Sequence, residues 1–266
     1  MRIKKYCMMT LMLFFGLTGF AFAHTLWLNA SDYTPKVYPA FGAKTKIYFG
    51  WGHRYPVDDF LSADSLVDYA LFGPDGDRQK LSPNPGGFLA TPVSLKKQGA
   101  YQVGASLRPG FYTIYEQNGK THHKIGPKIG LEGVVMSLYY EEYAKALILA
   151  GQAPDDAFKK AIGHNLEIIP LRRPSEIRQG DFLPVQVLFE GRPTRYCKVN
   201  GTFSGFASNS DFAYSTTTNA EGEAKIRILQ HGAWLVKAEM KLPATEELKE
   251  KCNERSYSAT LTFEVP

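Results

Sequence analysis

Apolar and polar positions alternate along much of the chain, and this alternation predicts β-strands. In the first half, apolar residues recur at every second position over 47–51 and again over 101–107. A further strand is predicted over 111–116, and Asn118-Gly119 directly after it is a dipeptide that favours a tight hairpin. Short strands separated by turn residues in this way are typical of an antiparallel β-sandwich.

The second half of the chain repeats the pattern. Strands are predicted at 183–189, 224–228, 234–240 and 257–265, and turn residues such as those of 190–193 lie between them. We expect a second, smaller antiparallel sandwich with immunoglobulin-like architecture.

Between the two halves the apolar spacing changes. Apolar or aromatic residues recur at steps of three and four, and Gly151 follows them as a residue suited to end a helix. The residues in this pattern are Tyr140, Tyr143, Ala144, Leu147 and Ile148. The spacing predicts one amphipathic helix, followed by a shorter helical turn over 155–162.

Length and composition support two globular domains. Hydrophobic residues make up 44% of the chain and charged residues 21%, which is typical of folded proteins. Residues 24–266 exceed the roughly 100–200 residues of a single domain. We therefore expect an all-β protein of two antiparallel sandwich domains, 24–128 and 164–266, joined by a helical connector at 129–163.

The first 23 residues have the pattern of a cleavable export signal. Arg2, Lys4 and Lys5 precede an apolar run, and Ala21 and Ala23 supply the small residues that a signal peptidase recognises. No later apolar run approaches the ~20 residues of a membrane span. We expect a periplasmic protein whose mature chain begins at His24.

A histidine at the first position has a particular chemistry. Its free α-amino group, with a pKa of about 7.7–8.0, and its imidazole, with a pKa of about 6.5, are both available as neutral ligands near neutral pH. Because both groups belong to one residue, they can close a chelate ring on a metal ion. Chance placement of a histidine after the cleavage site is the alternative interpretation.

Three more histidines belong to the first predicted domain, namely His53 and the adjacent pair His122 and His123. With His24 they are candidate ligands for Ni, Co, Cu or Zn, because imidazole suits these metals. Alternate residues of a strand face opposite sides, so only one of His122 and His123 can face a common site. His164 and His231 each lie beside a glycine in the second domain, where we expect structural roles.

Other features exclude several functions. Little net charge remains once the three basic residues of the export segment leave, so there is no electrostatic case for nucleic acid. Nucleophile-elbow, zinc-protease and phosphate-loop motifs are absent from the sequence. Adjacent carboxylates such as Glu141-Glu142 are expected on the solvated surface. Cys197 and Cys252, both in the mature chain, are expected to form a disulfide in an oxidising compartment.

Several stretches resemble the exported family DUF4198, once grouped with nickel-uptake proteins. They are the mature start 23–28, then 139–146, 163–171, 191–193, 220–222 and 231–236. The resemblance implies a periplasmic β-rich protein, often encoded near nickel or cobalt importers, with a metal-binding role. It marks His24 as the mature terminus and His53 as a candidate ligand.

These observations lead to three hypotheses of different classes. The first is a monomeric periplasmic protein that binds Ni²⁺ or Co²⁺ and assists uptake by an inner-membrane importer, without catalysis. The second is a structural or carbohydrate-binding β module whose histidines are incidental. The third is a copper oxygenase that uses a terminal-histidine brace.

Overall fold

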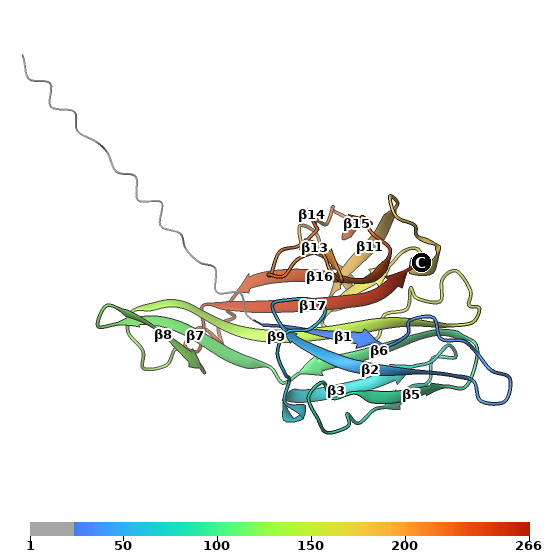
Figure 1. Ribbon diagram of the computed structural model, residues 1–266. Helices are drawn as coiled ribbons and strands as arrows, with labels where there is room; N and C mark the ends of the chain where they lie inside the picture. Colours follow the sequence, from blue (N-terminus) through green and yellow to red (C-terminus); the bar gives the residue numbers. More distant parts are fainter. Residues whose placement is uncertain (1–23) are drawn as a thin grey trace, which may run out of the picture.

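The computed structural model describes residues 24–266 and shows an all-β protein, as expected (Figure 1). Within this range the helical segments are two short 3₁₀ turns, Ala63–Ser65 and Pro174–Glu176. No helix of residues 24–266 is long and apolar enough to cross a membrane. The expected export signal, 1–23, lies outside the described residues.

The largest sheet joins the two halves of the chain. Its ten strands are β3 (Leu66–Phe72), β4 (Arg78–Lys80), β6 (Gly99–Leu107), β7 (Gly110–Gln117), β8 (Lys120–Ile125), β9 (Val134–Ala150), β13 (Lys198–Phe203), β14 (Tyr214–Thr217), β16 (Gly232–Pro243) and β17 (Glu254–Val265). They lie in the order β14-β13-β16-β17-β9-β6-β3-β4, and β7 pairs with both β8 and β9. The junction is the parallel pair β17–β9, which runs from Glu254 opposite Leu138 to Thr262 opposite Ala146.

Two smaller sheets complete the fold. One contains β1 (Thr25–Ala30), β2 (Ala43–Gly52) and β5 (Thr91–Leu95), and the other contains β10 (Leu166–Pro170), β11 (Phe182–Phe189), β12 (Arg192–Pro193) and β15 (Glu223–Arg227). They cover opposite faces of the large sheet, because Ala146 of β9 packs in one hydrophobic cluster with Leu28, whereas Leu147 packs in another with Ile168. The division into domains 24–128 and 164–266 stays a prediction.

The predicted helical connector is wrong, because its core is the 17-residue strand β9. The apolar spacing of three and four residues did not indicate a helix here. Small sheets cover both faces of β9, and every position from Tyr143 to Ala150 is buried or half-buried. A strand buried on both faces loses the alternation that would identify it. The predicted helical turn over 155–162 is also wrong, because Asp155–Phe158 form only turns.

The expected disulfide is absent, and Cys197 and Cys252 are both free, buried thiols. Cys197 directly precedes β13 and Cys252 lies just before β17, whereas β16 separates these two strands. Two strand spacings amount to ~10 Å, more than the roughly 7 Å that a disulfide spans between Cα atoms. The Cys197 thiol instead donates to the Glu239 carbonyl, with 3.3 Å between the sulfur and the oxygen.

Strand β1 is buried along its whole length and fixes the start of the described chain. The hydroxyl groups of Thr260 and Thr262 on β17 donate to its carbonyl oxygens at Leu26 and Leu28, at 2.8 and 2.6 Å. Trp27 lies directly over its cross-strand partner Gly50, where a Cβ atom would come within 1.9 Å of the indole nitrogen. These contacts hold the residue before β1, His24, in a defined place.

Candidate metal and ligand site

The β1–β2 pairing brings His24 and His53 together. His24 directly precedes Thr25, His53 directly follows Gly52, and Thr25 and Gly52 are cross-strand partners. The two imidazole rings meet edge to face, with centroids 4.6 Å apart and an interplanar angle of 79°. The Trp51 indole also contacts His24 edge to face, at a centroid distance of 5.3 Å. Two of the four candidate histidines are therefore neighbours.

A compact loop holds His53. The Asp58 carboxylate accepts hydrogen bonds from the backbone amides of His53 and Arg54 at 2.7 and 3.2 Å, and the Arg54 side chain donates to it at 2.8 Å. Gly52 starts the loop with a φ of +131°, in a region that favours glycine, and a Cβ there would clash with Asp58. Burial, and then the neighbouring His24, lower the pKa of His53, which favours the neutral imidazole.

The histidine pair lies at a cavity of about 460 Å³ between the end of β2, the β7–β8 hairpin and β9. The cavity is lined by His24, Trp51, His53, Phe111, Tyr112, His123, Ile125, Leu138, Tyr140 and Glu142. Most of this wall is aromatic or aliphatic. Three imidazoles, one carboxyl and the polar ends of Trp51, Tyr112 and Tyr140 are set in this apolar wall, as in many small-molecule sites.

The structure separates His122 from His123. Asn118 and Gly119 both have positive φ and close the predicted hairpin between β7 and β8. His122 and His123 are adjacent residues of β8, so their side chains face opposite sides of this strand. His123 lines the cavity and contacts the Tyr112 hydroxyl. His122 stacks on Tyr115, with ring centroids 5.2 Å apart, and is not among the cavity residues. Of the two alternatives that the sequence left open, His123 is the one that shares the cavity with His24.

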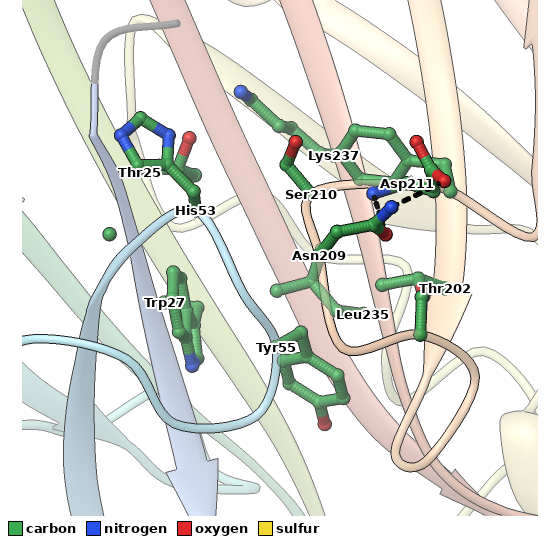
Figure 2. Close-up of a pocket in the computed structure, with 13 residues that line it drawn as sticks. Thr25, Trp27, His53, Tyr55, Thr202, Asn209, Ser210, Asp211, Leu235 and Lys237 are labelled. Carbon is green, nitrogen blue, oxygen red and sulfur yellow. Dashed lines mark hydrogen bonds between the residues drawn. The ribbon is translucent and has the colours of Figure 1, made fainter.

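A second, smaller pocket of about 40 Å³ adjoins His53 (Figure 2). Its wall is more polar and includes Thr202, Lys237 and the loop residues Asn209–Asp211. Figure 2 shows the His53 imidazole beside Thr25, between this pocket and β1. His53 therefore borders both hollows.

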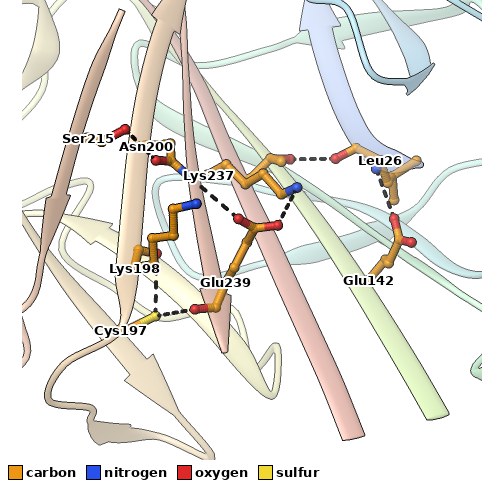
Figure 3. Close-up of polar contacts among 9 residues, drawn as sticks. Leu26, Glu142, Cys197, Lys198, Asn200, Ser215, Lys237 and Glu239 are labelled. Atoms are coloured by element: carbon orange, nitrogen blue, oxygen red, sulfur yellow. Dashed lines mark hydrogen bonds and ion pairs between the residues drawn. The ribbon is translucent and has the colours of Figure 1, made fainter. Parts of the chain in front are cut away.

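His24 also borders a pocket that is lined by charged side chains, among them Glu142, Lys237 and Glu239. Glu142 of β9 is 5% exposed, and one of its carboxylate oxygens accepts from the Leu26 amide at 2.9 Å (Figure 3). Burial raises the pKa of Glu142 to about 8, although Lys237 and the Leu26 amide act in the opposite direction. Lys237 itself pairs with Glu239 at 2.6 Å. The expectation that Glu142 is a solvated surface carboxylate is therefore wrong.

Sequence reasoning missed Glu142 and the aromatic wall. The signal available was the strand periodicity of β9, on which Tyr140 and Glu142 share one face, but the helical interpretation of this segment concealed it. The two remaining histidines lie elsewhere. His164 packs on Tyr143, which belongs to the opposite face of β9, and His231 is exposed beside Gly232.

The residues present supply only part of a metal site. Within residues 24–266, no group of three or more His, Cys, Asp or Glu side chains is arranged to hold a metal ion. With metal–nitrogen bonds of about 2.1 Å, each imidazole centroid would lie roughly 3.2 Å from an ion. Rings 4.6 Å apart would then occupy adjacent positions, roughly 90° apart. The ring separation by itself permits two cis positions for His24 and His53, and further donors would have to come from elsewhere.

The fold and the site define an all-β protein with an imidazole-bearing, aromatic-walled cavity at the meeting point of two sheets. Residues 21–242 match the family described as "Domain of unknown function (DUF4198)", and the chain belongs to this family. The sequence resemblance to DUF4198 is thereby confirmed. No curated protein matches the sequence.

Among solved structures, the chain is similar to domains of intimin, to a repeat of a large adhesion protein and to a DUF4785 family protein. The D0–D1 domain of intimin shares 13% identity over 90% of this chain and 96% of that chain, with a TM-score of 0.21. A tetra-tandem repeat of a large adhesion protein shares 12% identity over 92% of this chain and 74% of that chain, with a TM-score of 0.24. A DUF4785 family protein from Legionella pneumophila shares 8% identity over 79% of this chain and 50% of that chain, with a TM-score of 0.23. Similarity at this level carries no argument about function.

Proposed function

We propose that this chain is a periplasmic metal-binding protein that holds Ni²⁺ or Co²⁺ through His24 and His53 and assists uptake by an inner-membrane importer. The observation that supports metal binding is the pair of imidazoles 4.6 Å apart at the cavity. The delivery role and the importer follow from the family resemblance. We expect the protein to act as a monomer.

Removal of 1–23 would add a third nitrogen donor. The new α-amino group would belong to His24 itself and would close a chelate ring with its imidazole. Three nitrogen donors of this kind suit Ni²⁺, Co²⁺ and Cu²⁺ better than hard cations such as Mg²⁺ or Ca²⁺. His123 lines the same cavity, but its ring is engaged with Tyr112 and forms no three-residue cluster with the pair.

The test is calorimetric titration of Ni²⁺ and Co²⁺ into protein that begins at His24 and into a variant with one additional Ala before His24. The extra residue moves the amine away from the imidazole and leaves the fold unchanged. If the amine and its chelate ring contribute about 3 kcal/mol, the dissociation constant rises roughly a hundredfold. His53→Ala should weaken binding to a similar extent.

The hairpin offers a matched control. His122→Ala removes an imidazole from the same strand as His123 but from outside the cavity, so the affinity should stay unchanged. Equal affinity of the native and extended termini would contradict the terminal-histidine site. If neither form binds metal, the structural or carbohydrate-binding module is the better hypothesis.

A further inference from the structure

The cavity beside the histidine pair is much larger than a metal ion requires. Six water molecules at ~30 Å³ each occupy about 180 Å³, whereas the cavity measures about 460 Å³. An ion held by His24, His53 and the α-amino group would keep no more than about three of these waters, so most of the space lies outside its coordination shell. The extra volume needs another explanation.

The chemistry of the wall indicates what that space can hold. Trp51, Phe111, Tyr112, Leu138 and Tyr140 present aromatic and aliphatic surface to it. Water gains little from such a wall, whereas a flat organic group gains by burying apolar surface and by stacking on aromatic rings. The large sheet and the β1–β2 pair form this surface in advance, so binding there requires little rearrangement.

The count of protein ligands leads to the same conclusion. His24 and His53 supply two imidazoles, the expected α-amino group supplies one more nitrogen, and no three-donor cluster is present in residues 24–266. Ni²⁺ held by these three nitrogens would keep coordination positions that the protein does not fill. An organic ligand in the apolar space could fill them with its own nitrogen or oxygen atoms.

We propose that the site binds the metal ion together with a small organic chelator, whose donor atoms complete the coordination beside His24 and His53 and whose apolar part packs against Trp51, Tyr112 and Tyr140. This inference rests on the proposed metal-binding function and names the substrate class of the same site. The ligand that the protein binds is then a metal chelate and not the hydrated metal ion.

The test compares three forms of nickel with protein that begins at His24. These are Ni²⁺ alone, the one-to-one complex with 2,2′-bipyridine, which has flat aromatic rings, and the one-to-one complex with ethylenediamine, which has the same number of donors and little apolar surface. We expect the bipyridine complex to bind roughly tenfold more tightly than the ethylenediamine complex, because only the former buries apolar surface in the cavity. Nickel and bipyridine should elute with the protein at one equivalent each.

Two tyrosines of β7 give matched variants. Tyr112 lines the cavity and Tyr115 does not, yet both are half-buried and each contacts one histidine of β8. Tyr112→Ala should remove the preference for the bipyridine complex, while Tyr115→Ala should keep it. Tyr115→Ala should also bind Ni²⁺ alone like the native protein.

The outcomes separate this inference from the proposed function. Equal binding of the two complexes, or loss of the preference in both tyrosine variants, overturns the chelate inference but leaves metal binding in place. Equally tight binding of bipyridine without nickel also overturns it, since the cavity would then be an organic site independent of metal. No binding of nickel in any form overturns both proposals.

Discussion

At the scale of single residues, Glu142 makes a testable contribution to stability. Its pKa is about 8 in the folded protein against an ordinary value of 4.5, so between these values the native state keeps a proton that the unfolded chain releases. The native protein should therefore lose stability as pH rises through this range, by up to about 1.4 kcal/mol per pH unit. In the Glu142→Gln variant the side chain cannot ionise but can still accept the hydrogen bond from the Leu26 amide. The stability of this variant should therefore decline less than that of the native protein as pH rises.

The measurement is the free energy of unfolding from denaturant titrations between pH 4.5 and 8. Glu132→Gln, at an exposed position, is the matched control and should keep the native pH dependence. Identical profiles for the native protein and Glu142→Gln would show that the carboxylate is ionised in the folded state.

At the scale of elements, the loop after β2 decides where His53 lies. Asp58 accepts three hydrogen bonds from His53 and Arg54, and their N–H groups lower its pKa although burial opposes this. Asp58→Ala should cost about 1–2 kcal/mol of stability and accelerate hydrogen exchange at the His53 and Arg54 amides. Because the imidazole then loses its fixed position, metal affinity should fall as well.

Asp59 provides the control for this loop. It is exposed, and its side chain accepts only from the Phe60 amide, so Asp59→Ala should leave exchange at His53 unchanged. Native-state hydrogen exchange followed by mass spectrometry makes the comparison. If Asp58→Ala leaves the exchange of His53 unchanged, the loop is held by its contacts with β1 instead, where Trp27 and Asn29 donate to the Pro56 carbonyl.

At the scale of the whole molecule, the question is whether the two hydrophobic clusters unfold together. Strand β9 contributes to both clusters and pairs with β17 over nine residue pairs, so we expect one cooperative unit. In a Trp234→Phe background, fluorescence comes from Trp27 of β1 and Trp51 of β2, strands that contribute to the first cluster. Ile226→Ala, in the core of the second, should cost about 2–5 kcal/mol and lower the denaturation midpoint that these two tryptophans report.

Lys225→Ala, at the exposed neighbouring position of β15, is the control and should leave the midpoint unchanged. A midpoint unaffected by Ile226→Ala would mean that β17 and β9 come apart before either hydrophobic cluster unfolds. Residues 164–266 would then be an autonomous domain with the predicted boundary.

The sequence by itself determined the all-β class, seven of the seventeen strands of residues 24–266 and the hairpin at Asn118-Gly119. These features are local, since they depend on two-residue periodicity and on turn residues that tolerate positive φ. The sequence also indicated His24 as the expected mature terminus, and the family resemblance marked His53 as a candidate ligand. Their contact itself depends on the antiparallel register of β1 and β2.

Only the tertiary structure decided the rest. β9 is a strand because sheets cover both of its faces, a circumstance that no local pattern records. Cys197 and Cys252 remain apart because β16 lies between their strands, and Glu142 is buried because β1 packs over β9. The cavity likewise exists only where β2, β7, β8 and β9 meet. Each of these outcomes depends on which distant segments pack together, which is a property of the assembled core and not of any single stretch of chain.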